Sequence, residues 1–278
     1  MRECHKTSIG IIVGTGTKQF LQQMKPAPSE ELTINTRYGE VRLICLRWQR
    51  ENTKDIVDVF ILPRHGYRHE VPPHMINYKA NIAALKRVCV DGIIATAAVG
   101  ALHDNLKIGD ILIPDQLIDW TRQRPLTFFE HDSSALVHVD MTQPYCERLR
   151  KLLLTASVKA KVKAVDGGCY VCTDGPRYET AAEVKALKLL GGDVVGMTVA
   201  TEATLAREAC TCYTALCVVT NYAAGVGGAH PSHSEVAEVM KQASNNLSLL
   251  ISTAVDLYVV EDCICKHSLD EYGIEPPV

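Results

Sequence analysis

The chain alternates short apolar runs with longer segments in which apolar residues recur at helical spacing. Apolar runs of about four to eight residues, bounded by Gly, Pro or polar clusters, are typical of strands. We therefore expect strands at residues 8–13, 41–46, 56–62, 92–98, 110–113, 169–172 and 213–220.

The segments with helical spacing lie between these runs. We expect helices at residues 75–89, 144–159 and 180–190, the last of them ended by Gly191 and Gly192. The sequence Ser232-His-Ser-Glu235 has the pattern of a capping box, and apolar residues follow it at helical spacing as far as Leu257. A long helix should therefore begin at Ser232.

Strands that alternate with helices indicate the α/β class, with a largely parallel or mixed central sheet flanked by helices. We see no internal repeat, low-complexity linker or break in composition. The sequence therefore predicts one domain over residues 1–262, followed by a loose C-terminal tail at residues 263–278.

Composition narrows the function without identifying it. The 278 residues carry a formal net charge of −3, with 47% hydrophobic and 22% charged residues, which is typical of globular proteins. The near-neutral balance argues against nucleic acid as a partner, and no apolar run approaches the roughly 20 residues that span a bilayer. An anionic ligand would have to be held by a local site.

The chain has 11 cysteines, and its polar start gives no sign of a secretory leader. Both features favour reduced thiols in a cytoplasmic protein. Cys169-Tyr-Val-Cys172, and Cys263-Ile-Cys265 followed by His267, could be metal or redox pairs. Because no second pair follows at zinc spacing, we favour buried small apolar side chains and expect no metal.

Four segments could carry chemistry, because each follows an expected strand and α/β proteins place ligands at the carboxyl ends of strands. They are Val13-Gly-Thr-Gly16, Pro63-Arg-His-Gly66, Ala95-Thr-Ala-Ala-Val-Gly100, and Cys172-Thr-Asp-Gly-Pro-Arg-Tyr-Glu179 with Gly196-Met-Thr198. Glycine lets backbone N–H groups approach an anion, and the Arg64 guanidinium matches phosphate oxygens.

Each segment also has a simpler explanation. The glycines could form a tight turn, Arg64 could be solvated, and Glu179 could be a carboxylate favoured at a helix start. Asn221, His230 and His233 are further polar positions of the same kind. The residues by themselves indicate an α/β enzyme that binds a small anionic ligand.

Together these segments resemble the purine nucleoside phosphorylases, specifically the trimeric group that includes methylthioadenosine phosphorylases. The resemblance covers residues 8–255. Its motifs are Ile9-Gly-Ile-Ile-Val-Gly-Thr-Gly16, Arg64-His-Gly66, Asn77-Tyr-Lys-Ala-Asn-Ile82, Gly109-Asp-Ile111, Asp174-Gly-Pro-Arg177 and Gly196-Met-Thr198. It implies a single-domain phosphorylase/nucleosidase-like fold with a mixed central sheet.

The resemblance also implies a reaction, in which phosphate attacks the anomeric carbon of a nucleoside and releases a purine and ribose 1-phosphate. Inorganic phosphate would be a co-substrate, with no metal and no organic cofactor. The phosphate site implied by the resemblance comprises Thr15, Arg64, His65, Ala97, Ala98 and Thr198.

The implied nucleoside site comprises Tyr178 on the purine face, Met197 on the ribose, and Glu179, Asn221, Tyr222, Ala223 and His233. Since a neighbouring subunit closes the sugar end in this family, His138 of that subunit should take part, and a homotrimer is expected. The implied catalytic residues are Arg64, Glu179 and Asn221.

Three positions depart from the methylthioadenosine type and match 6-oxopurine phosphorylases: Glu179, Asn221 followed by Tyr222 and Ala223, and His233. A 6-oxopurine presents N1–H as a donor and O6 as an acceptor, whereas adenine presents the reverse. The Glu179 carboxylate accepts, the Asn221 amide can donate, and His233 can bond a 5′-hydroxyl. We therefore expect inosine and guanosine as substrates.

Alternatives remain open at this point. They are phosphorolysis of S-methyl-5′-thioadenosine or S-methyl-5′-thioinosine, hydrolysis by a nucleosidase, and nucleoside binding without turnover. Ala97 stands where Thr or Asn is usual, which gives slight support to the last of these. Arg64 and His65 speak against a nucleosidase.

Overall fold

A computed structural model describes residues 7–24, 29–130, 136–276 and 278 of the chain. Residues 1–6, which include Cys4 and the polar start, lie outside the described residues. The strands are β1 (Ser8–Val13), β2 (Ser29–Thr36), β3 (Gly39–Gln49), β4 (Ile56–Pro63), β5 (Gly92–Ala101), β6 (Ile111–Ile113), β7 (Gln116–Asp119), β8 (Ala164–Asp166), β9 (Cys169–Cys172), β10 (Val194–Gly196) and β11 (Cys212–Tyr222).

The helices surround these strands. The α-helices are α1 (Thr17–Gln23), α2 (Tyr78–Arg87), α3 (Glu147–Ala160), α4 (Ala181–Leu189), α5 (Val199–Glu208) and α6 (His233–Leu257). The 3-10 turns are η1 (Pro73–Met75), η2 (Val226–Gly228), η3 (Ile264–His267) and η4 (Asp270–Tyr272). No helix in the described part of the chain is long and apolar enough to cross a membrane.

The strands of the described residues form one mixed sheet with β5 at its centre. Along its length β5 pairs in parallel with β1 and β11, and its last residues pair antiparallel with β10. The path β2-β3-β4-β1-β5-β10-β9-β7 passes through β5, and a branch of β11, β6 and β8 also starts from β5. This confirms the expected α/β class with a mixed sheet.

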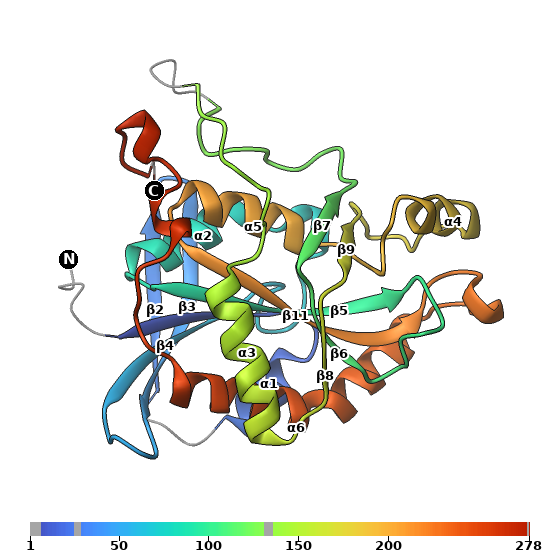
Figure 1. Ribbon diagram of the computed structural model, residues 1–278, viewed down its shortest axis with the longest axis horizontal. Coiled ribbons are helices and arrows are strands. Elements are labelled where there is room, and N and C mark those ends of the chain that lie inside the picture. The colour runs from blue at the N-terminus through green and yellow to red at the C-terminus, as the bar shows by residue number, and fades with distance from the viewer. Residues whose placement is uncertain (1–6, 25–28, 131–135, 277) are drawn as a thin grey trace.

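Two apolar clusters cover the two faces of the sheet. Along β1, Ile9 and Ile11 belong to one cluster and Ile12 belongs to the other, as the alternation of side chains along a strand requires. Helices α2 and α5 pack together near one face, whereas α6 packs against α1 and α3 on the other. Figure 1 shows these two layers, with α4 projecting at one edge.

The apolar pattern located most of the expected strands within a few residues, and β1 and β9 have the predicted ends. The predicted start of the last long helix at Ser232 is also confirmed. Ser232 is the N-cap of α6, and its hydroxyl accepts a hydrogen bond from the Glu235 N–H at 3.3 Å. The expected helix at residues 144–159 begins later than predicted, with Cys146 as its N-cap.

The segment after Asp262 is not loose where the structure describes it. Its residues 263–276 contain η3 and η4, and Cys265 and Leu269 are buried against the body at 2% exposure each. The sequence analysis expected a loose tail, whereas these two side chains of the described segment are packed against the body.

Candidate functional site

A cavity of about 500 Å³ lies at the carboxyl end of β5, a volume suited to a nucleoside-sized ligand. It brings together almost all the residues that the sequence singled out. These are Thr15, Arg64, His65, Ala97, Ala98, Tyr178, Glu179, Met197, Thr198, Asn221, Ala223 and His233.

The sheet explains why these distant residues meet. Strands β1, β4, β5 and β11 run parallel, so the loops that follow them open at the same edge. Gly14 lies there against Arg64, and a Cβ added at Gly14 would lie 2.7 Å from the Arg64 Nη1 atom. A residue without a side chain is therefore needed at this position.

Arg64 is held by a buried ion pair that the sequence did not reveal. Its Nε donates to Glu202 Oε1 at 2.5 Å, its Nη2 to Glu202 Oε2 at 2.8 Å, and its Nη1 to the Thr96 carbonyl at 2.7 Å. The Tyr213 hydroxyl also donates to Glu202 Oε2, at 2.7 Å. Arg64 and Glu202 are 3% and 0% exposed, so the guanidinium is fixed in one orientation.

Burial alone would lower the pKa of Arg64, but the adjacent Glu202 carboxylate more than offsets this and raises the pKa. Arg64 therefore stays charged, and its bonds to Glu202 and Thr96 use only some of its N–H donors. The start of α5 adds positive potential, because Thr198 is the N-cap of that helix and lines the same cavity. This end of the cavity can hold an anion.

His65 lies beside Arg64 as a neutral imidazole. Burial, with the charge of Arg64 as the next cause, lowers its pKa to about 3. Its Nδ1 lies 2.8 Å from the Val71 carbonyl, so a neutral ring donates there and keeps Nε2 as an acceptor. In this tautomer the ring therefore offers an acceptor, and no second donor, to a ligand.

Glu179 and Tyr178 stand in the loop between β9 and α4, and both line the cavity. Its Oε1 accepts from the Thr173 hydroxyl at 2.7 Å, which orients the carboxylate. Met197, from the turn between β10 and α5, lies against Gly175 of the same loop. A flat polar ligand could meet an aromatic face and a fixed acceptor here.

Asn221 reaches the cavity through an irregularity in β11. The register of β11 against β5 shifts between Val219 and Asn221, and such bulges redirect side chains. The Asn221 Oδ1 atom lies 3.0 Å from the Thr220 hydroxyl, and Nδ2 donates to the Tyr222 carbonyl at 2.9 Å. Asn221 is buried, with one amide hydrogen remaining for a ligand.

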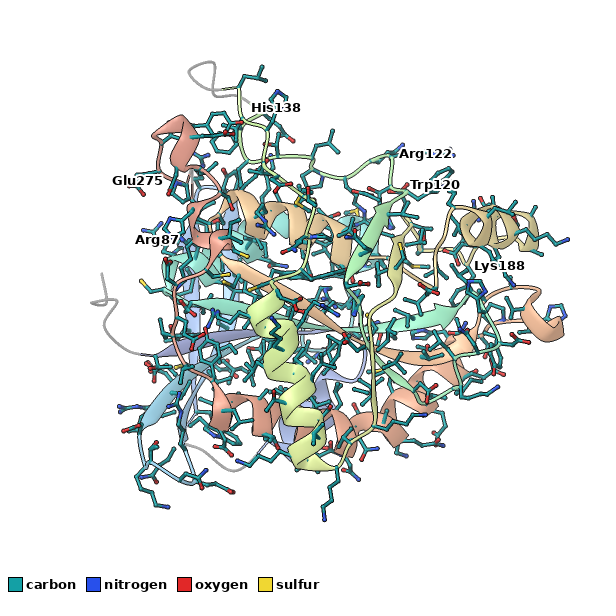
Figure 2. The ribbon with its side chains drawn as sticks, in the orientation of Figure 1. Arg87, Trp120, Arg122, His138, Lys188 and Glu275 are labelled. Carbon is teal, nitrogen blue, oxygen red and sulfur yellow. The ribbon has the colours of Figure 1, made fainter. Side chains whose placement is uncertain are left out.

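Two expected residues do not line the cavity. The Tyr222 side chain is half-buried and packs against the apolar cluster around β5, since the residue after Asn221 faces the other side of the strand. His138 is exposed on the long connection before α3, and its main chain bonds the Tyr272 hydroxyl. Figure 2 shows it beside the C-terminal segment that also carries Glu275.

Several residues of this site were missed by sequence reasoning, namely His69, Thr173, Glu202 and Tyr213. The His69 ring is tilted against His65, with ring centroids 4.4 Å apart, and stacks on His233 at 5.9 Å. Glu202 gave no signal because it stands inside a helix that is buried nearly all round. Among the described residues, the group of possible metal ligands is Cys146, Cys212, Cys263 and Cys265, and none of them lines this cavity.

The strand ends of the mixed sheet enclose a fixed arginine, a glycine turn and a helix N-terminus. These features are those of an α/β enzyme that binds anionic small molecules. Residues 8–256 match the phosphorylase superfamily, and the chain belongs to this family.

Relatives are similar over nearly the whole chain. The 6-oxopurine nucleoside phosphorylase of Pyrococcus furiosus is 45% identical over 270 residues, which cover 94% of this chain and 97% of that protein. A probable S-methyl-5′-thioinosine phosphorylase of Methanothermobacter thermautotrophicus is 43% identical, with coverages of 94% and 88%. A crystal structure of methylthioadenosine phosphorylase from an antarctic soil metagenomic library has a TM-score of 0.83 at 32% identity, covering 96% and 92% of the chains.

Proposed function

We propose that this chain is a purine nucleoside phosphorylase that cleaves 6-oxopurine nucleosides, inosine and guanosine, with phosphate. The products are the free base and ribose 1-phosphate. The observation that carries the proposal is the pairing of an anion site around Arg64 with Glu179 and Asn221 in the same cavity. The relatives named as 6-oxopurine nucleoside phosphorylases support the same substrate class.

In the proposed reaction a phosphate oxygen bonds the anomeric carbon as the bond from that carbon to the purine nitrogen breaks. The sugar develops positive charge and the purine negative charge, and the purine then takes up a proton. Arg64, Thr15, Thr198 and the backbone around Ala97 and Ala98 hold the phosphate in place for attack. The acceptor Nε2 of neutral His65 suits the hydroxyl of hydrogenphosphate.

At the purine end, the amide hydrogen of Asn221 bonds N7 or O6, where negative charge develops. The Glu179 carboxylate accepts from N1–H, and Tyr178 stacks on the ring. Adenine offers a lone pair at N1, which faces the carboxylate unfavourably. Met197 packs on the ribose, Ala223 leaves room beside the base, and His233 lines the cavity as an exposed side chain.

Phosphorolysis of S-methyl-5′-thioinosine is the second candidate, because relatives near 43% identity carry that name. Release of hypoxanthine from inosine and from S-methyl-5′-thioinosine, each measured with and without phosphate, tests both. Base release from inosine that requires phosphate supports the proposal. Release without phosphate would indicate a nucleosidase, and no release would indicate a binding protein.

We infer further that the enzyme is a cytoplasmic homotrimer of purine salvage that needs no metal or organic cofactor for catalysis. The exposed His138, remote from the cavity of its own chain, suits a contribution to a neighbouring site. Sedimentation equilibrium tests the trimer. Mixing a His138→Ala variant with an Arg64→Ala variant tests shared sites, since mixed trimers would recover part of the activity.

A further inference from the structure

Four cysteine side chains from three separate segments meet on the face of the sheet that carries α3 and α6. They are Cys146 at the start of α3, Cys212 at the start of β11, and Cys263 and Cys265 in the segment after α6. Their sulfur atoms all lie within 4.8 Å of one another. The Cys263 Sγ is 3.5 Å from that of Cys146 and 3.7 Å from that of Cys265.

These separations suit one tetrahedral metal ion. With zinc–sulfur bonds of about 2.3 Å, tetrahedral geometry places neighbouring sulfurs about 3.8 Å apart. The separations of 3.5 and 3.7 Å are close to that value, and every other pair lies within 4.8 Å, so small side-chain rotations complete the tetrahedron. Four thiolates with no open position are typical of structural zinc sites, not of catalytic ones.

The surroundings suit a charged thiolate cluster. The Arg148 guanidinium lies near Cys212, and Cys146 is the N-cap of α3, where backbone N–H groups favour negative charge. A zinc ion with four thiolates carries a net negative charge, which the Arg148 guanidinium offsets in part, although Asp91 shares that guanidinium at 2.7 Å. Cys146, Cys212 and Cys265 are buried, and the half-buried Cys263 leaves one side for metal entry.

We propose that Cys146, Cys212, Cys263 and Cys265 form a structural Zn²⁺ site that fixes the C-terminal segment to the body of the enzyme. Binding releases the thiol protons to solvent, so zinc affinity rises with pH. The sequence analysis expected no metal because Cys263 and Cys265 had no partner pair nearby in the chain. The fold supplies the other two ligands one at a time, from positions far apart in sequence.

The test uses the full chain purified with a reductant, stripped with a chelator, and dialysed against zinc. Elemental analysis should then find about one zinc ion per chain. Cobalt in place of zinc should give the intense thiolate charge-transfer and d–d absorption of a tetrahedral sulfur site. Cys263→Ser should lose most of the zinc, whereas the matched control Cys169→Ser, at a free cysteine outside the cluster, should retain it.

Removal of zinc from the wild type should lower the thermal midpoint and leave the phosphate KM unchanged, as expected for a site outside the cavity. The cobalt spectrum of the wild type decides the matter even if Cys263→Ser fails to fold. The proposal is overturned if the reduced wild type takes up no zinc, if its cobalt spectrum lacks thiolate ligation, or if Cys263→Ser binds zinc as well as the wild type. Disulfides among these four cysteines that persist in the reduced, zinc-treated protein would also overturn it.

Discussion

Arg64 and Glu202 form a two-pronged ion pair, with Nε–Oε1 and Nη2–Oε2 distances of 2.5 and 2.8 Å. Because both side chains are buried, each neutralises the charge of the other, which would otherwise lie in the core without a counterion. Arg64 also lines the cavity, so one residue belongs both to the buried core and to the proposed anion site. A lysine could not reproduce the two parallel bonds.

Replacing Arg64 by Ala should therefore destabilise the protein as well as weaken phosphate binding. Loss of one partner of a buried pair costs about 3–5 kcal/mol, because the Glu202 carboxylate would remain buried without a counterion. The phosphate KM should rise far more than the nucleoside KM. Urea unfolding and steady-state kinetics measure the two effects.

The double variant Arg64→Ala/Glu202→Gln separates the two roles. Removing the stranded carboxylate should restore part of the lost stability, while the phosphate KM should remain high. As a control, Glu208→Gln on the same helix removes a carboxylate that bonds the Phe128 N–H, away from Arg64. If the double variant regained normal phosphate affinity, Arg64 would not be a phosphate ligand.

Gly14→Ala should disturb the anion site without removing any polar group. The new Cβ would lie 2.7 Å from Arg64 Nη1 and 3.2 Å from the Thr96 carbonyl, so the guanidinium must shift. Misplacement of a binding group by about 1 Å can cost on the order of 10²-fold in activity. We expect kcat/KM for phosphate to fall by about 10- to 10²-fold.

Gly10→Ala, on β1 shortly before Gly14, is the matched control. Its Cβ would meet Leu85 at 3.3 Å, in the core and away from Arg64. It should lower stability and spare the phosphate KM. Equal kinetic effects of the two substitutions would mean that Gly14 acts only through packing.

The sequence predicted the helices and strands in which apolar residues on a buried face alternate with polar residues on an exposed face. Helix α5 was not predicted. Its charged residues Glu202, Arg207 and Glu208 are buried, so the helix has no exposed polar face that a sequence pattern could reveal. The polar edge strand β2 was also missed, since its outer residues are exposed. In both cases tertiary contacts override the local pattern.

The candidate site divides in the same way. Arg64, Glu179 and Asn221 stand in segments beside expected strand ends, which made them candidate ligand positions, and the resemblance implied that they share one site. Glu202 and Thr173 orient Arg64 and Glu179, and such supporting residues have no local signature. The four-cysteine cluster escaped for the same reason, because only the fold brings its members together.

His65 should make the protein sensitive to acid. Its pKa is lowered from 6.5 to about 3, chiefly by burial and then by Arg64, so the unfolded chain binds the proton more readily. The contribution of His65 to the free energy of unfolding is fully present above about pH 6.5 and decreases as the pH falls toward 3. At pH 5 the loss is about 2 kcal/mol.

His65→Asn should remove this contribution, so the difference between variant and wild type should shrink as the pH falls from 7 to 5. Unfolding in phosphate-free buffer measures it, and His230→Asn, at an exposed position that does not line the cavity, is the control. A parallel pH dependence in wild type and His65→Asn would show that His65 protonates freely in the folded enzyme.

Asn221→Asp should weaken inosine cleavage and shift preference toward adenosine. The change keeps the side-chain shape and the acceptor near Thr220 but removes the Nδ2 donor. Loss of a donor that acts in the transition state costs about 2–4 kcal/mol, or roughly 30- to 10³-fold in kcat/KM. Asn246→Asp, exposed on α6, makes the same chemical change away from the cavity. Unchanged inosine kinetics in Asn221→Asp would exclude the role given to this amide.

His233 should decide what the enzyme accepts at the sugar 5′ position. It lines the cavity as an exposed side chain near His69, so its imidazole can bond a 5′-hydroxyl. Wild type should then prefer inosine to S-methyl-5′-thioinosine, by about 2- to 10-fold for one hydrogen bond of 0.5–1.5 kcal/mol.

His233→Val should erase or reverse that order, because an apolar wall suits a methylthio group and leaves a hydroxyl without a partner. The matched control is His230→Val, at an exposed position that does not line the cavity, and it should leave the ranking unchanged. If His233 served only the start of α6, its substitution would alter stability and spare the ranking. A wild-type preference for S-methyl-5′-thioinosine would contradict the role of His233, whereas Glu179 and Asn221 would still argue for a 6-oxopurine, since they act at the other end of the nucleoside.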